Sequence, residues 1–96
     1  MVKAALAIAL YVALVVVAIA LLVRLLAGRI PGVTITSWWR SIPHNDDVGG
    51  LPGSLHILGW AVDIVPVTPE IEEQARKMFP VVVNEGNHLH AAIFKA

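Results

Sequence analysis

The sequence predicts an α+β fold, a small and mostly antiparallel sheet with one or two helices, preceded by one transmembrane helix. Three observations support this prediction. Apolar residues are concentrated at the N-terminus, the rest of the chain mixes short β-type runs with one amphipathic helix, and the alternating strand–helix rhythm of a parallel sheet is missing.

The composition limits the classes of protein that need considering. The 96 residues suffice for one small domain. Seven Lys and Arg residues balance seven Asp and Glu residues, so the formal net charge is zero, and we expect no nucleic-acid partner. Hydrophobic residues make up 57% and charged residues only 15%, whereas soluble domains carry about 25% charged residues. Part of the chain is therefore expected to lie in a non-aqueous environment rather than in solvent. The lack of cysteine excludes disulfides and thiolate metal ligands.

The N-terminal segment has the length of a membrane span. Residues 4–23 carry no charge and are bounded by Lys3 and Arg24. A helix of about 20 residues covers roughly 30 Å, the thickness of the hydrocarbon core of a bilayer. We predict an uncleaved membrane anchor over residues 1–27, which contacts the membrane through residues 4–26. A cleaved signal peptide, whose apolar region is usually shorter, and a buried core helix are the alternatives.

The flanking charges leave the orientation of this anchor open. Lys3 and the α-amino group lie on one side, and Arg24 and Arg29 lie on the other. The Gly- and Pro-containing residues 28–32 predict a linker, so residues 33–96 form the candidate domain. A domain this small without disulfides often requires a bound metal for stability.

Within this domain, local patterns predict each element in turn. Thr68 is the expected N-cap of a helix that has Pro69 in its first turn, acidic residues near its start and basic residues near its end, and that stops at Pro80. Gly59 is expected to allow a tight turn. One or two helical turns are expected over residues 43–48. Strands are expected over residues 33–38, 60–65, 81–83 and 88–94.

Histidines and carboxylates occur together in two short segments. The first segment contains His56 and Asp63, and the second contains Glu85, His88 and His90. Imidazole and carboxylate are the ligands that zinc accepts without thiolates, and a catalytic zinc takes three protein ligands and a water. His56, Asp63 and one histidine of the second segment would satisfy that count, although spacing alone leaves the choice of histidine open. Each residue taken singly is more often a solvated or core residue, but together they favour a metal site.

The position of each residue adds to this interpretation. Asp63 lies within an apolar strand, where a buried carboxylate is costly unless it is paired or bound to a metal. His88 and His90 are expected to point to one face of the final strand. Glu85 precedes His88 by three residues and is a candidate general base.

Three blocks of the chain, covering about residues 33–94, carry a family signature. Glu85 and His88 match Glu-x-x-His, and the upstream run over residues 37–50 looks like a third block. The pattern Ser-x-His-x-x-Gly-x-Ala-x-Asp is matched at every fixed position, by Ser54, His56, Gly59, Ala61 and Asp63. These blocks resemble the zinc D-Ala-D-Ala peptidase family, which includes D,D-carboxypeptidases, vancomycin-resistance dipeptidases and phage L-alanyl-D-glutamate endolysins.

The resemblance implies roles for individual residues. It implies one zinc ion per chain, with Glu85 as the catalytic base and with Arg40 binding substrate or steadying the oxyanion. Ser54 is implied as a hydrogen-bonding neighbour of the site. His90 is left as a second-layer or substrate contact, because an acidic residue would be expected at position 87 if His90 were a ligand, and Asn87 stands there. The implied zinc ligands are His56, Asp63 and His88.

The resemblance also implies a function and a location. The family's members are hydrolases of peptidoglycan stem peptides, acting as carboxypeptidases or endopeptidases, and their fold is shared with hedgehog domains. Because that substrate lies outside the cytoplasmic membrane, we expect a single-pass membrane protein with its catalytic domain on the periplasmic or cell-wall side. A zinc-binding module that holds a wall peptide or partner without cleavage, and an anchor that acts alone, are the alternatives. Trp60 is expected either to pack on the sheet or to form a substrate wall.

Overall fold

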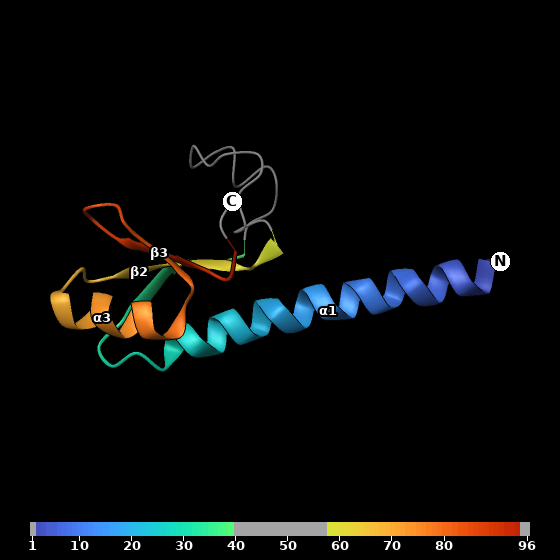
Figure 1. The fold of residues 1–96 in the computed structure, drawn as a ribbon, viewed down its shortest axis with the longest axis horizontal. Helices are drawn as coiled ribbons and strands as arrows, with labels where there is room; N and C mark the ends of the chain where they lie inside the picture. Colours follow the sequence, from blue (N-terminus) through green and yellow to red (C-terminus); the bar gives the residue numbers. More distant parts are fainter. Residues whose placement is uncertain (1, 40–57, 95–96) are drawn as a thin grey trace.

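The computed structural model describes residues 2–39 and 58–94, which form two helices and four strands. In chain order these are α1 (Val2–Gly28), β1 (Thr34–Ser37), β2 (Ala61–Val65), α3 (Pro69–Met78), β3 (Val81–Asn84) and β4 (Leu89–Ala92). Figure 1 shows a small domain from which α1 projects as a long rod, and the molecule measures 53 × 28 × 19 Å. The predicted α+β class with an apolar N-terminal helix is confirmed.

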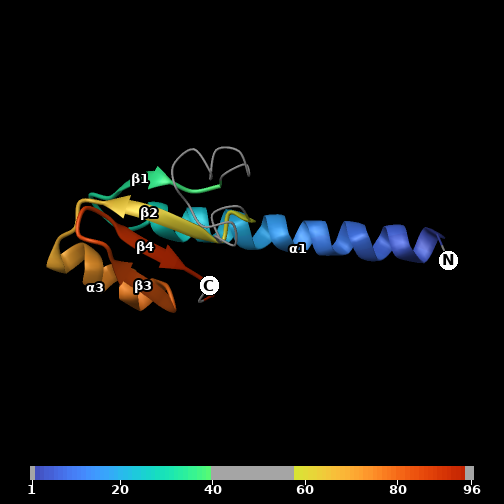
Figure 2. The same cartoon turned by 90° about the horizontal axis from the view of Figure 1, so that it is seen from above.

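The four strands form one antiparallel sheet in the order β1-β2-β4-β3 (Figure 2). All three neighbouring pairs are antiparallel, as the sequence predicts. The central pair, β2 and β4, aligns Asp63 with His90 and Ile64 with Leu89. The last strand is shorter than expected, because it ends at Ala92 rather than at residue 94. The helical turns expected over residues 43–48 lie outside the described residues.

Helix α3 has the boundaries that its capping residues predict. Thr68 is extended and its Oγ1 accepts a hydrogen bond of 3.1 Å from the backbone N–H of Ile71, which satisfies one of the unpaired donors of the first turn. Ile71 and Ala75 are buried on one face, together with Phe79 directly after the helix. This face packs α3 against the sheet and leaves its charged residues in solvent.

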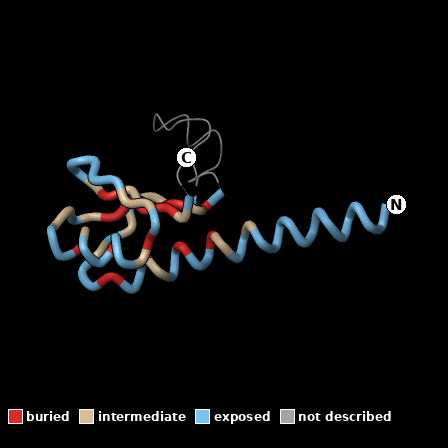
Figure 3. Tube along the Cα trace, viewed as in Figure 1, coloured by how far each residue is buried: buried red, intermediate tan, exposed pale blue. Residues whose placement is uncertain are grey.

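Helix α1 changes its environment along its length (Figure 3). Residues 2–15 are exposed on all sides, whereas Ala20, Val23 and Ala27 are buried against the domain. The spacing of the buried residues is that of a single helix face. Ile30, within the segment expected to be a linker, is also buried. The C-terminal part of α1 therefore contributes to the hydrophobic core.

The two faces of the sheet differ in chemistry. Val62, Ile64, Leu89 and Ala91 belong to the core cluster shared with the two helices. Asp63 alternates with the core residues of β2, so it and its register partner His90 lie on the opposite face. Polar residues of β2 and β4, Asp63 and His90, thus lie on the face opposite the two described helices.

Candidate metal centre

Four of the seven predicted site residues lie in the described part of the chain. Asp63 comes from β2, Glu85 and His88 come from the turn between β3 and β4, and His90 comes from β4. The remaining three predicted residues, Arg40, Ser54 and His56, lie outside the described residues. The described part of the predicted site is therefore a cluster of two carboxylates and two histidines.

Asp63 is the buried carboxylate of this cluster. It is only 9% exposed, and its Oδ1 lies 3.3 Å from Nδ1 of His90 on the neighbouring strand. Because a carboxylate oxygen accepts, the contact is a hydrogen bond in which His90 Nδ1–H is the donor. This hydrogen bond offsets the cost of placing a carboxylate in an apolar strand. It agrees with the expectation that a buried Asp63 is paired or bound to a metal.

His88 lies between the two carboxylates. Its Nε2 is 3.8 Å from Asp63 Oδ1 and 3.6 Å from Glu85 Oε2. Its other ring nitrogen, Nδ1, lies 2.6 Å from Oδ1 of Asn87. An amide oxygen only accepts hydrogen bonds, so His88 Nδ1–H is the donor in this contact, and in the neutral ring the lone pair is on Nε2.

Asn87 was not predicted to be part of the site. In metal sites, the partner of the second ring nitrogen sets the tautomer and the orientation of a histidine ligand. Asn87 has this relationship to His88 through the 2.6 Å contact. The feature of the sequence that points to Asn87 is its amide, which directly precedes the candidate ligand His88. The prediction of the zinc ligands takes position 87 into account only for the absence of an acidic residue there.

The turn that carries Glu85 is held by hydrogen bonds at both ends. The backbone N–H of Glu85 donates to the carbonyl of His88 at 3.0 Å, and the N–H of Gly86 donates to Oδ1 of Asn84 at 2.9 Å. Gly86 has φ = +92°, a conformation that disfavours residues with a side chain. Together these features hold Glu85, whose side chain is 47% exposed, beside His88.

A bulge in β1 lies next to Asp63. The register passes from Ile35 opposite Ile64 to Ser37 opposite Asp63, so Thr36 is the extra residue. Thr36 Oγ1 donates a 3.3 Å hydrogen bond to the backbone carbonyl of Asp63. Bulges are frequent next to active sites because they redirect a strand locally.

The donor chemistry of the cluster fits part of a zinc site. In a tetrahedral site with bonds of about 2.0–2.2 Å, ligand atoms lie about 3.4 Å apart. Asp63 Oδ1 and His88 Nε2 are separated by 3.8 Å, which is close to this distance. Within residues 2–39 and 58–94, however, no group of three histidines or carboxylates has the arrangement of a metal site. The predicted set takes two ligands from these residues and the third, His56, from outside them.

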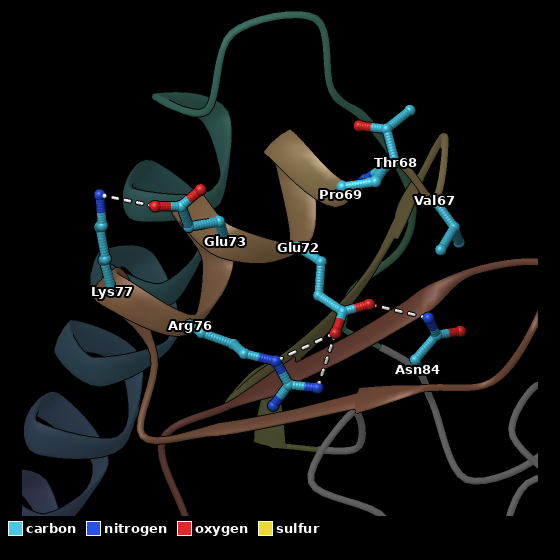
Figure 4. Close-up of a pocket in the computed structure, with 8 residues that line it drawn as sticks. All are labelled: Val67, Thr68, Pro69, Glu72, Glu73, Arg76, Lys77 and Asn84. Carbon is cyan, nitrogen blue, oxygen red and sulfur yellow. Dashed lines mark hydrogen bonds and ion pairs between the residues drawn. The ribbon is translucent and has the colours of Figure 1, made fainter.

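A separate pocket lies between α3 and β3 and contains none of the predicted site residues (Figure 4). Within it, both nitrogens Nε and Nη2 of Arg76 donate to Glu72 Oε2, at 3.1 and 2.9 Å, and Asn84 Nδ2 donates to Glu72 Oε1 at 2.7 Å. The hydrogen bonds from Arg76 and then from Asn84 lower the pKa of Glu72 below its ordinary value. Asn84 connects this network to the turn that carries Glu85.

Histidines and carboxylates of this small α+β domain lie on the face of the sheet opposite α1 and α3. Comparison with protein families shows that the chain belongs to the Peptidase M15 family, whose sequence profile matches residues 12–90. The match confirms the resemblance to the D-Ala-D-Ala carboxypeptidase group. It begins within α1, so the matched region includes the part of the helix that packs on the sheet. No curated protein and no solved structure matches the chain.

Membership in this family implies a peptidase and suggests hydrolysis of peptidoglycan peptides. The family is typically zinc-dependent. Among the described helices, α1 is the one with the length and composition to cross a membrane, which are features that anchors share with signal sequences.

Proposed function

We propose that this protein is a membrane-anchored zinc peptidase that cleaves D-amino-acid-containing bonds in peptidoglycan stem peptides. Family membership supports the peptidase class. The observation that carries the proposal is the position of His88 Nε2, which lies 3.8 Å from Asp63 Oδ1 and 3.6 Å from Glu85 Oε2. One side chain thus adjoins both a proposed ligand and the proposed base.

In this proposal His56, Asp63 and His88 hold one zinc ion. Zinc, when bound, supplies a Lewis acid that polarises the scissile carbonyl and lowers the pKa of a bound water. The hydrogen bond from His88 Nδ1–H to Asn87 Oδ1 supports the choice of His88 as ligand, because in the neutral ring it leaves the lone pair on Nε2. The hydrogen bond from His90 Nδ1 to Asp63 gives His90 a supporting role, holding the carboxylate in place.

The remaining steps belong to the side chains around the ligands. Glu85 accepts a proton from the attacking water and passes it to the leaving amine, a role that its partly exposed position beside His88 permits. Arg40 stabilises the negative charge that develops on the carbonyl oxygen. Ser54 is proposed to be a hydrogen-bonding neighbour of the site.

The proposed location follows from the substrate and from α1. Stem peptides lie outside the cytoplasmic membrane, so the domain would face the periplasm or the cell wall. Most of α1 is apolar and exposed, and its length permits a membrane span. We therefore propose that α1 is retained as an anchor whose exposed residues from 4 to 22 contact lipid, whereas Ala20 and Val23 are buried against the domain.

The decisive experiment is digestion of purified peptidoglycan by the full chain in detergent micelles with added zinc, followed by mass spectrometry of the released peptides. Glu85→Gln should retain zinc and lose cleavage, because the amide cannot accept the proton. Glu73→Gln is the matched control, since Glu73 lies on the exposed face of α3 and pairs only locally with Lys77. Cleavage by Glu85→Gln at the parent rate would exclude Glu85 as the base. A zinc-loaded parent that binds stem peptides without cleaving them would instead support the binding module.

A further inference from the structure

An aromatic cluster lies beside the point where α1 leaves the domain. We define it as Trp38, Trp39, Trp60 and Phe94. Trp60 Nε1 donates a 3.1 Å hydrogen bond to the carbonyl of Val16 on α1, and its ring lies 5.4 Å from that of Phe94.

Gly59 brings the other two rings to the same place. Its φ is +73°, and a Cβ built on it would lie 2.8 Å from Ala20 Cβ on α1 and 3.4 Å from atoms of both Trp38 and Trp39. Trp38 Nε1 also donates a 2.9 Å hydrogen bond to the carbonyl of Gly59. The three tryptophans of the protein therefore all lie beside the stretch of α1 from Val16 to Ala20.

Much of this cluster is exposed. Trp39 is 62% exposed, Phe94 51%, and the adjoining Leu58 40%. Large apolar side chains grouped on a surface indicate an interaction site. Because tryptophan combines an apolar ring with one N–H donor, it concentrates at the level of lipid headgroups in membrane proteins.

The length of α1 points to lipid as the occupant of this surface. The part of α1 that is exposed on all sides, residues 2–15, is about 21 Å long at 1.5 Å per residue, whereas the hydrocarbon core of a bilayer is about 30 Å thick. About six more residues are needed to complete the span, which takes it to about Leu21. Those residues include the ones beside the aromatic cluster, and the side of α1 that faces away from the sheet remains apolar there, with Val17 and Leu21 exposed.

We propose that the aromatic cluster is a membrane-docking surface that sits at the boundary between the headgroups and the hydrocarbon core and holds the domain directly on the bilayer. This proposal rests on the anchor role proposed for α1. It differs from a simple anchor with a flexible linker, because the buried contacts of Val23, Ala27 and Ile30 join α1 rigidly to the domain. A helix joined in this way fixes the depth of the domain as well as its attachment.

The unaltered chain allows a direct test, because all tryptophan emission arises from the cluster. The full chain is reconstituted in vesicles of phosphatidylcholine and phosphatidylglycerol that contain lipids with a nitroxide quencher either at the headgroup or near the end of the acyl chain. We expect loss of tryptophan emission, stronger with the headgroup quencher than with the chain-end quencher. Stronger quenching by the chain-end nitroxide, or no quenching by either, would overturn the docking proposal.

Single cysteine variants separate this proposal from the anchor itself, since the chain contains no cysteine. An environment-sensitive fluorophore on Leu10→Cys, an exposed position near the middle of the proposed span, should be quenched by the chain-end nitroxide. One on Glu70→Cys should be unaffected, because α3 lies at the end of the molecule away from the N-terminus (Figure 1). A quenched label at position 10 with unquenched tryptophans would retain the anchor and exclude docking. An unquenched label at position 10 would exclude the anchor, and the docking proposal with it.

Discussion

His90 Nδ1 lies 3.3 Å from Asp63 Oδ1, although 27 residues separate the two in the chain. The contact depends on the register of β2 and β4, in which these residues are direct partners. His88, two residues earlier, approaches the same carboxylate oxygen through Nε2 at 3.8 Å. The two histidines therefore have different relationships to Asp63, and substitutions should distinguish them.

Replacing each histidine by phenylalanine should change zinc binding to different extents. His88→Phe removes a proposed ligand and should abolish stoichiometric binding. His90→Phe removes a hydrogen bond to a ligand, a change that typically weakens metal affinity about 10- to 100-fold. Competition with a chromophoric chelator measures both affinities. Abolished binding in His90→Phe with a small loss in His88→Phe would exchange the two roles.

Gly59→Ala should destabilise the domain more than Gly32→Ala. Both glycines have positive φ, +73° and +78°, so each substitution introduces backbone strain of about 1–2 kcal/mol. At Gly59 the new Cβ would also meet Ala20 Cβ at 2.8 Å, whereas nothing lies within 4 Å at Gly32. We expect an additional cost of about 1–3 kcal/mol at Gly59. Thermal unfolding of both variants in detergent measures the difference, and equal melting temperatures would contradict the close approach of α1.

Val23→Ala should lower the stability of the domain, whereas Leu21→Ala should not. Val23 is fully buried among core residues, while Leu21 on the same helix is half exposed. Removing two methyl groups from the core should cost about 2 kcal/mol. Chemical unfolding in detergent, monitored by tryptophan emission, compares the two variants. If neither substitution changes the unfolding midpoint, α1 does not contribute to the core.

Acid should remove the stabilisation that Glu72 provides. Its pKa is lowered by hydrogen bonds from Arg76 and Asn84, so the folded protein binds this proton less readily than the unfolded chain. Stability from this group is therefore present above the unfolded pKa of about 4.3 and is lost as pH falls through the lower folded value. The difference in melting temperature between the parent and Glu72→Gln should be largest near neutral pH and vanish in acid.

The exposed pair of Glu73 and Lys77 provides the control for this titration. Both side chains are more than 60% exposed, so Glu73→Gln should change the melting temperature little at any pH. A difference between the parent and Glu72→Gln that persists unchanged into acid would show that the carboxylate charge is not its source.

Local patterns were sufficient to predict most elements of the fold. Thr68 and Pro80 delimit α3 because capping and the missing N–H of proline act within one turn. The strands were recognisable from their alternation and their turn residues, although β4 is shorter than expected. The positive φ at Gly59 agrees with the tight turn predicted there.

The contacts of Trp60 could not be inferred in this way. From the sequence alone, packing on the sheet and a substrate wall were equally compatible with its position. In the structure its indole N–H bonds to the carbonyl of Val16, which is 44 residues away, and its ring contacts Phe94. This placement depends on where α1 crosses the sheet, and no local pattern encodes that.

The sequence by itself determined the element types, the long apolar N-terminus and the order of the histidines and carboxylates that carry the family signature. Tertiary structure alone decided that the C-terminal part of α1 belongs to the core and that the tryptophans gather beside α1. It also decided that, of the two histidines of the second segment, His90 rather than His88 forms a hydrogen bond with Asp63. The physical reason is the distance along the chain over which each kind of interaction acts. Propensity and capping act over a few residues, whereas strand register and helix–sheet packing arise from side chains far apart in the chain that share one buried surface.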